Sequence, residues 1–272
     1  MTPSGLFDAA RFERLRRERS LALGTPLVCT ATTGSTSDDA LAAARVGAPH
    51  GMTFVTDYQS AGRGRRGRSW IAPAGECLLF SVVLKLPFDL EALPVISLVA
   101  GLAARATIAH HLAERSERSP SSRTAAVGVK WPNDVWVGDR KIAGVLVEAQ
   151  MNGAALACVV VGIGVNVTVT HFPNTLGTTA TSLSLEGGAA SREELLADVL
   201  LGLERRSHLL LRGDRAALLD ELRAHDVLLG RRVRVEAVTG VAAGIDEEGR
   251  LCVRVEGGTV TPVRTGTVEL LP

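Results

Sequence analysis

The last part of the chain has a pattern that few folds accommodate. From Gly230 onward, apolar and polar residues alternate in short runs, and turn-forming residues at Gly240, Gly249 and Gly257 separate these runs. Alternation with a period of two is typical of half-buried strands, and glycine turns between such strands are typical of hairpins. Strands so closely spaced predict a small β-barrel. We expect them at 231–236, 241–245, 251–255, 259–263 and 268–271.

The longer part that precedes this barrel mixes helical and strand patterns. Ser191 with Glu194 three residues later predicts a capping box at a helix start. Helices are expected at 7–19, after Ser35, and at 94–112, 191–211 and 214–225. Strands are expected at 25–29, 52–55, 77–86, 127–130, 135–137, 141–149 and 155–162, with a surface loop at 114–125. The fold class is therefore α+β, with a larger domain at 1–228 and a small β-domain at 229–272.

Composition narrows the function. A net charge of +1 leaves no global positive field for nucleic acid or a membrane surface, so any polyanion site must be local. The four cysteines are scattered without a CxxC pair, which favours free thiols over zinc ligands or disulfides. We find neither a signal peptide nor an uninterrupted apolar run of membrane-spanning length. The expected location is cytoplasmic.

A tract rich in glycine and arginine, Gly62-Arg63-Gly64-Arg65-Arg66-Gly67-Arg68-Ser69-Trp70, is the most unusual stretch. It fits GxGxxG and nearly fits the phosphate-loop pattern, but both require a helix directly afterwards. The sequence that follows, Ile71-Ala-Pro-Ala-Gly75, prevents one. We interpret the tract as a mobile anion clamp, whose glycines admit a ligand to the backbone and whose arginines neutralise phosphate or carboxylate. A solvated, RNA-touching loop is the alternative.

A second cluster of polar residues lies at 130–144. Lys130-Trp-Pro-Asn133-Asp134 precedes a predicted hairpin, and Lys141-Ile-Ala-Gly144 follows it. Each residue alone fits an ordinary strand end. Together they place two ammonium groups, an amide and a carboxylate at the ends of one short hairpin unit, where they are able to reach phosphate oxygens and a divalent cation.

These motifs occur in an order that resembles a known enzyme family. Ser35-Thr36, Gln59, the 62–67 tract, the KWPND pentad at 130–134, the KIAG tetrad at 141–144 and Gly162-Ile-Gly-Val-Asn166 are similar to the motif series of biotin protein ligases. The resemblance runs from about residue 25 to the end. It is to the short, monofunctional class, which lacks an N-terminal DNA-binding domain. It implies a catalytic domain of the biotin/lipoate ligase type, which has a mixed β-sheet with flanking helices and is similar to class II aminoacyl-tRNA synthetases. It also implies a C-terminal SH3-like β-barrel.

The resemblance implies a two-step reaction. The biotin carboxylate attacks the α-phosphorus of ATP, which gives biotinyl-5′-AMP and pyrophosphate. The amine of a lysine on a biotin carboxyl carrier domain then attacks the mixed anhydride. Two anions must be brought together, which costs Coulomb energy unless cations lie between them. ATP and biotin are then substrates, Mg²⁺ is the metal, and no DNA or membrane partner is expected.

The same resemblance implies roles for individual residues. Lys141 and Arg65 are the expected catalytic residues. The expected biotin-binding residues are Ser35, Thr36, Ser37, Gln59, Gly62, Arg63, Gly64, Arg65, Trp70, Lys141, Gly144 and Gly162. The expected nucleotide-binding residues are Arg63, Arg65, Arg66, Lys130, Asn133, Asp134 and Asn166, with Asp134 also the expected Mg²⁺ ligand.

One position departs from the family pattern. The family commonly has Ser-Thr-Asn, whereas this chain has Ser37 in the third place. A serine hydroxyl is able to take over either hydrogen bonding or helix capping. Two other functions stay open at this point: a lipoate ligase, which shares the body but typically lacks the arginine-rich tract, and an RNA-binding module, which the low aromatic content disfavours. Monomer and homodimer are both compatible with the sequence.

Overall fold

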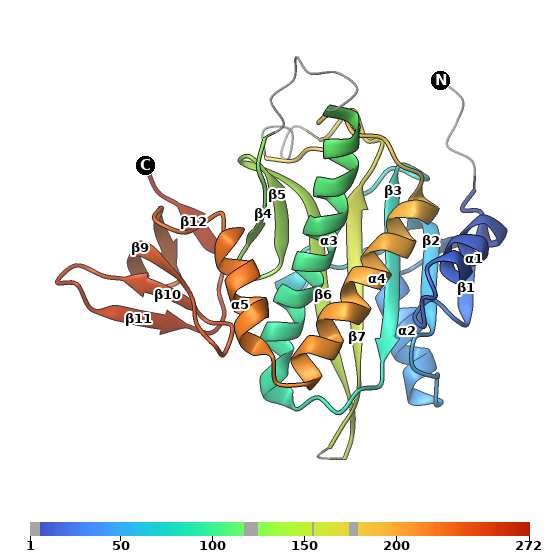
Figure 1. Cartoon of the computed structure of the whole chain (residues 1–272), viewed down its shortest axis with the longest axis horizontal. Coiled ribbons are helices and arrows are strands. Elements are labelled where there is room, and N and C mark those ends of the chain that lie inside the picture. Colours follow the sequence, from blue (N-terminus) through green and yellow to red (C-terminus); the bar gives the residue numbers. More distant parts are fainter. Residues whose placement is uncertain (1–5, 117–124, 154, 174–178) are drawn as a thin grey trace.

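The computed structural model describes residues 6–116, 125–153, 155–173 and 179–272. Its larger part is a seven-stranded sheet in the order β1-β2-β3-β7-β6-β5-β4 (Figure 1). Only β1 and β2 run parallel, and the other neighbouring pairs are antiparallel, so the sheet is mixed, as expected. The strands are β1 (Leu27–Thr33), β2 (Thr53–Gln59), β3 (Cys77–Leu84), β4 (Val127–Lys130), β5 (Asp134–Val137), β6 (Arg140–Asn152) and β7 (Ala155–Asn166).

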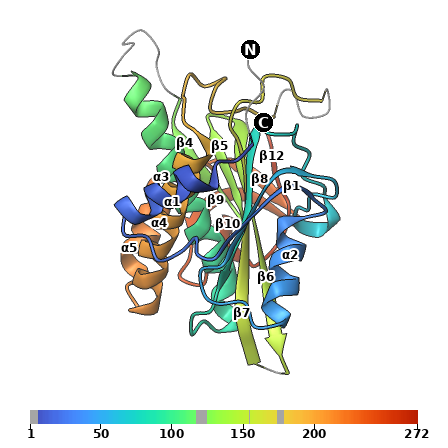
Figure 2. The ribbon, with the colours of Figure 1, turned by 90° about the vertical axis from the view of Figure 1, so that its right-hand side faces the viewer.

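Helices cover the two faces of this sheet unequally. Figure 2 shows α1, α3, α4 and α5 on one side and α2 alone on the other. The helices are α1 (Ala9–Glu18), α2 (Thr36–Arg45), α3 (Leu93–Ser116), α4 (Arg192–Leu211) and α5 (Arg215–Ala224), with short 3-10 turns η1 (Arg65–Gly67) and η2 (Leu90–Ala92). The predicted capping box of Ser191 and Glu194 is present at the start of α4. By length and composition the segment Leu90–Glu114 could cross a membrane, but 72% of its most apolar window is buried. It is therefore the core helix of the fold.

The alternation of side chains along β7 separates the two faces. Val159, Val161 and Ile163 belong to the main hydrophobic core, which includes α3 and α4. Because successive residues of a strand point to opposite faces, Gly162 and Gly164 face the side of α2. Since α2 contacts β2, β3 and β7, and glycine presents no side chain, this face is left with space beside the helix.

The C-terminal part forms a second sheet in the order β11-β10-β9-β8-β12. Its strands are β8 (Arg232–Val235), β9 (Val238–Ile245), β10 (Leu251–Arg254), β11 (Val260–Val263) and β12 (Val268–Leu270). All five predicted strands are present, and all neighbouring pairs are antiparallel. The ladder does not close between β11 and β12, so this is an open sheet consistent with a small SH3-like barrel domain.

The second sheet shares its core with the first body. Trp131 is 1% exposed and belongs to the same cluster as Val233 and Leu251. Its indole N–H donates to the carbonyl oxygen of Gly249 at 2.9 Å. The boundary at 228/229 stays a prediction, but a common core joins the residues on its two sides.

The structure differs from the predicted turn at Gly240 and from part of the predicted loop at 114–125. A turn at Gly240 is wrong, because this residue lies within β9 and the β8–β9 turn is at Glu236 and Ala237. Glycine is required at 240 for another reason: a Cβ there would lie 2.2 Å from the carbonyl oxygen of Arg254. Of the surface loop expected at 114–125, the first residues belong to α3, and residues 117–124 lie outside the described ones.

Candidate active site

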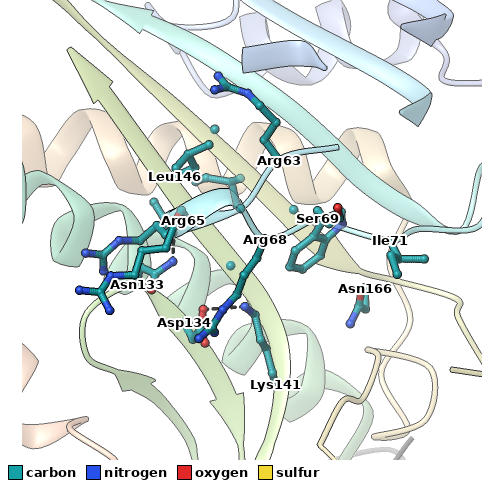
Figure 3. Close-up of a pocket in the computed structure, with 18 of the residues that line it drawn as sticks. Arg63, Arg65, Arg68, Ser69, Ile71, Asn133, Asp134, Lys141, Leu146 and Asn166 are labelled. Atoms are coloured by element: carbon teal, nitrogen blue, oxygen red, sulfur yellow. Dashed lines mark hydrogen bonds and ion pairs between the residues drawn. The ribbon is translucent and has the colours of Figure 1, made fainter. Parts of the chain in front are cut away.

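A cavity of about 480 Å³ lies on the α2 side of the large sheet. Its volume is in the range of small-molecule sites. Its lining comes from the N-terminus of α2, strands β3, β6 and β7, the 62–70 tract, the 130–134 pentad and the segment 266–268 of the second sheet. Figure 3 labels lining residues from the 62–70 tract, from the 130–134 pentad and from β6 and β7. Every site residue predicted from the sequence lines this cavity except Gly62.

One end of the cavity is polar but uncharged. The side-chain oxygen of Gln59 accepts from the backbone N–H of Thr36 at 2.8 Å. The buried hydroxyl of Ser81 lies 2.9 Å from that of Thr36 and 3.1 Å from that of Ser37. Ser35 is the N-cap residue of α2, but its hydroxyl makes no capping bond and so stays available to a ligand. The structure therefore builds a cradle of hydroxyl groups at a helix N-terminus, which we call the hydroxyl end.

Glycines form the floor beside this end. A Cβ on Gly162 would lie 2.5 Å from the Ser37 hydroxyl, and one on Gly164 would lie 2.6 Å from the Trp70 ring. A Cβ on Gly144 would meet both Trp70 and Lys141, at 3.0 and 3.1 Å. A side chain at any of these positions would require a neighbouring group to move, because that group already occupies the space. The indole ring thus lies flat enough against the sheet to make an apolar wall.

The Gly/Arg loop, residues 62–70, is a closed loop rather than a free one. The N–H of Trp70 donates to the carbonyl of Gly62 at 2.9 Å, and the N–H of Gly64 donates to that of Arg68 at 2.7 Å. Gly62 must lack a side chain, since a Cβ would lie 2.5 Å from the carbonyl oxygen of Trp70. The expectation that the loop is mobile without ligand stays a prediction.

Arg63 does not point toward the other arginines (Figure 3). Its guanidinium group pairs with Glu148 of β6 at 2.6 Å and with Asp38 of α2 at 2.9 Å. Two carboxylates therefore already compensate its charge. This geometry does not support the expected role of the Arg63 side chain toward the nucleotide. The two ion pairs instead fasten the start of the Gly/Arg loop to α2 and β6.

The cations at the other end have no carboxylate partner among the described residues. Arg65 donates to the hydroxyl of Thr265 at 3.3 Å, and Arg68 donates to that of Thr267 at 2.9 Å. Lys130 donates to the carbonyl of Val268 at 3.1 Å. Burial lowers the pKa of Lys130. Burial also lowers the pKa of Arg65, and the charge of the neighbouring Arg66 lowers it further. These groups form the cationic end of the cavity, which an anionic ligand would stabilise.

Lys141 lies beside this end and is held from both sides. Its backbone N–H donates to the carbonyl of Thr179 at 2.8 Å, and its carbonyl accepts from Thr181 at 2.9 Å. Its ammonium group is 2.7 Å from the carboxylate of Asp134 and 5.4 Å from the centre of the Trp70 ring. The lysine is thus aimed at the middle of the cavity, between its two ends.

The two predicted asparagines are bound within the protein. The amide of Asn133 donates to the carbonyl of Val145 at 2.7 Å, and that of Asn166 donates to the carbonyl of Thr181 at 2.9 Å. Both still line the cavity. Their amide groups therefore hold the backbone around the site, and a ligand is left with the polar atoms that these two bonds do not use.

Some residues of the site were missed. Three of them had a signal in the sequence. Ser81 is a single hydroxyl within the apolar run CLLFSVVL, and Arg68 is the fourth arginine of the tract. Gly164 lies two residues after Gly162, on the same face of its strand. The segment 266–268 had no signal, because its place at the cavity depends on how the second sheet packs.

Comparisons with known proteins agree along nearly the whole chain. Residues 35–166 match the Biotin/lipoate A/B protein ligase family, and residues 228–271 match the Biotin protein ligase C terminal domain. The chain is 38% identical to the biotin–[acetyl-CoA-carboxylase] ligase of Mycobacterium tuberculosis, over 95% of both chains. It is 28% identical to the bifunctional ligase/repressor BirA of Bacillus subtilis, over 91% of this chain and 75% of that one. The biotin protein ligase from Aquifex aeolicus in complex with biotin and ATP superposes with a TM-score of 0.73 and 25% identity, covering 91% of this chain and 99% of that one.

Proposed function

This chain belongs to the biotin protein ligases, and from that premise we propose how its cavity carries out the two steps of the reaction. The enzyme activates biotin with ATP to biotinyl-5′-AMP and then transfers biotin to a lysine of a carrier domain. In the first step an oxygen of the biotin carboxylate forms a bond to the α-phosphorus, and the bond from that phosphorus to the pyrophosphate leaving group breaks. In the second, the lysine nitrogen bonds to the carbonyl carbon, AMP leaves, and the amine loses a proton.

The observation that carries this proposal is the contrast between the two ends of the cavity. Biotin has a neutral ureido ring at one end and a carboxylate at the other. The hydroxyl end offers donors and acceptors without charge, from Ser35, Thr36, Ser37 and Gln59. The Trp70 ring and the glycine floor offer an apolar surface for the chain between them. The carboxylate then reaches Lys141.

At the cationic end, Lys141 and Arg65 act where the two anions meet. The Lys141 ammonium group lies between the ends, where it is able to bind the biotin carboxylate and an α-phosphate oxygen together. Arg65, Arg68 and Lys130 are left for the remaining phosphate oxygens. Groups that are already in place stabilise developing charge without reorganising during the reaction. Arg66 is half exposed and lies at the outer rim.

Mg²⁺ is compatible with the residues present. Asp134 is the only carboxylate among the described residues that line the cavity. Mg²⁺ is commonly bound by one or two carboxylates together with substrate phosphates, so one aspartate fits an ion that arrives with ATP. When bound, the ion would neutralise phosphate charge. Asp134 also orients Lys141, whose position therefore depends on it.

The carrier and the location follow from the family. The Mycobacterium tuberculosis relative is named for acetyl-CoA carboxylase, which supports the biotin carboxyl carrier domain of such a carboxylase as the acceptor. We place the reaction in the cytoplasm, where ATP and the carboxylases are found, and propose no DNA or membrane partner. Monomeric and homodimeric states are both compatible with this mechanism.

The proposal is tested by isotope exchange between pyrophosphate and ATP. The purified protein with Mg-ATP should catalyse exchange only when biotin is added, and should label a carrier domain when that is supplied. Lipoate in place of biotin is the control, because it shares the carboxylate but lacks the ureido ring. Exchange that requires lipoate and not biotin would show that lipoate is the substrate. Exchange that needs neither acid would contradict the proposed function.

A further inference from the structure

The turn between β8 and β9 has an unexpected residue. Val235 and Val238 pair directly, which leaves a two-residue turn of Glu236 and Ala237. The first residue of such a turn commonly has a positive φ, and asparagine or glycine is favoured there. Glu236 instead adopts it, with φ of 52°. A long side chain is uncommon in this left-handed region, and such positions cluster where a side chain has a specific role.

The carboxylate of Glu236 pairs with a second residue in the same backbone state. Arg66, in the η1 turn of the Gly/Arg loop, has φ of 57°, and its guanidinium group donates to Glu236. Ser20 is the one other residue with a side chain and a positive φ in the part of the chain that the structure describes. Two of these three unusual backbone positions therefore lie at the two ends of one ion pair.

This pair joins the Gly/Arg loop to the second sheet. On either side of Arg66, Arg65 and Arg68 line the cavity and donate to Thr265 and Thr267. Within the described ranges, Arg66–Glu236 is the single ion pair between this loop and the second sheet. The hydrogen bond and charge of Arg66, with a weaker contribution from the backbone of Thr267, lower the pKa of Glu236 below its usual value. The carboxylate is thus charged at neutral pH.

Glu236 itself does not line the cavity, so it is no catalytic residue. Its turn is instead supported from below: a Cβ on Gly266 would lie 2.4 Å from Val235, so the segment after β11 packs directly under the end of β8. A rigid turn therefore presents the carboxylate to the loop, whose residues 65 and 68 face the reactants.

We propose that Glu236 is a positioning residue that holds the Gly/Arg loop over the cavity through Arg66, and so slows the escape of the acyl-adenylate before a carrier arrives. This inference rests on the proposed function. The reactive anhydride must be kept from water between the two steps, and a loop held by an ion pair on both sides does so better than one held by an ion pair on a single side. Arg63 fastens the start of the loop to α2 and β6, and Arg66 fastens the far side to the second sheet.

The test is the release of biotinyl-5′-AMP from the Glu236→Gln variant. The full chain is loaded with labelled biotin and Mg-ATP, unlabelled biotin is added in excess, and the loss of bound adenylate is followed. Because both side chains are half exposed, we expect release about three- to fivefold faster than in the wild type, with an unchanged rate of adenylate formation at saturating substrates and an unchanged thermal midpoint.

Two variants separate the ion pair from the turn. Glu236→Gly supplies the residue that the left-handed turn favours but no carboxylate, so release should be as fast as in Glu236→Gln. Glu269→Gln removes a comparable exposed pair, with Arg234 in the same sheet, that does not touch the loop. Its release should equal that of the wild type.

A double-mutant cycle tests whether Glu236 acts through Arg66. In an Arg66→Ala background, Glu236→Gln should add nothing to the release rate. A further increase there, or wild-type release from both Glu236 variants, would overturn the inference. A wild-type protein that forms no adenylate would contradict the proposed function instead, so the two failures are distinguishable.

Discussion

The two ends of the cavity are built in different ways. The hydroxyl end comes from α2, β2 and β3, which are neighbours within one sheet and its covering helix, and its polar groups already bond to one another. The cationic end is gathered from the Gly/Arg loop, the 130–134 pentad and the second sheet. Among the described residues, Arg65, Arg68 and Lys130 bond there to hydroxyl and carbonyl oxygens and to no carboxylate. The first end is complete without ligand, whereas the second needs an anion to complete it.

The difference matches the two tasks of the enzyme. Recognition of a neutral ring requires fixed donors and acceptors, and a sheet supplies them at low conformational cost. Joining two anions requires charge that is held in place but not neutralised beforehand. A carboxylate beside every arginine would make the cationic end more stable and less able to bind phosphate.

The largest expected effect concerns the residue between the two ends. Lys141→Ala should lower the rate of adenylate formation about 100-fold or more, because in the proposed mechanism it removes the cation that bridges both reactants. The measurement is biotin-dependent pyrophosphate exchange at saturating substrates. Lys85→Ala removes a lysine that donates to the carbonyl of Gly47, remote from the cavity, and is the control.

Loss of Lys141 also leaves Asp134 without its partner, and this must be separated from catalysis. Lys141→Ala combined with Asp134→Asn removes both charges of the pair. If the lysine acts on the reactants, the double variant stays as slow as the single one. Recovery to near wild-type exchange would show that the lysine only neutralises Asp134.

A smaller effect is expected at the hydroxyl end. Gly162→Ala places a Cβ 2.5 Å from the Ser37 hydroxyl and 3.2 Å from that of Ser81, so at least one hydroxyl must leave its position. We expect biotin affinity to fall about tenfold or more, with the affinity for ATP nearly unchanged. Calorimetric titration with each ligand measures both, and Gly34→Ala, where a Cβ meets nothing within 4 Å, is the control. Equal losses for the two ligands would remove the distinction between the ends.

The smallest effect concerns the segment that leads into the second sheet, and hence the support of the cationic end. Burial raises the pKa of Asp226 from 3.8 to about 6. The folded protein therefore binds this proton more tightly than the unfolded chain does. Protonated Asp226 therefore favours the folded state at low pH, and this contribution to stability is lost as the pH rises through about 4 to 6. At neutral pH the buried charge of Asp226 lowers the free energy of unfolding.

Asp226→Asn removes that charge but keeps the oxygen that accepts from the N–H of Leu228 at 2.9 Å. The variant should be more stable than the wild type by about 1–2 kcal/mol at neutral pH, and the gain should shrink toward pH 4. Urea unfolding at both pH values measures this difference. A gain that is the same at both would show that charge is not the cause.

Local patterns predicted much of this molecule because local physics determines it. The capping box at Ser191 was readable from its motif and the five short strands after Gly230 from side-chain periodicity, and the mixed sheet was implied by the resemblance. The motif residues also converge on one cavity, as the resemblance implied. Boundaries shifted by a few residues, as at β6 and β7, where pairing with a neighbour extends a strand beyond its own pattern.

The features that the sequence did not predict have a common origin in contacts between distant parts of the chain. The two ion pairs of Arg63 join it to Asp38, 25 residues before it, and to Glu148, 85 residues after it, and its expected role toward phosphate stays a prediction. Gly240 was expected in a turn, but it is in a strand that another backbone approaches closely. The contribution of residues 266–268 to the cavity was invisible for the same reason, since only the packing of the second sheet brings it there.

That packing has a consequence for any attempt to dissect the protein. Trp131 is an almost wholly covered side chain whose indole N–H finds its acceptor across the junction, at Gly249. Truncation near residue 229 would expose apolar surface and leave the indole N–H of Trp131 without an acceptor on the N-terminal fragment. The C-terminal fragment would lose much of its hydrophobic core. Heat or denaturant should accordingly melt the whole chain in a single cooperative event, and neither fragment is a sound surrogate for the intact polypeptide.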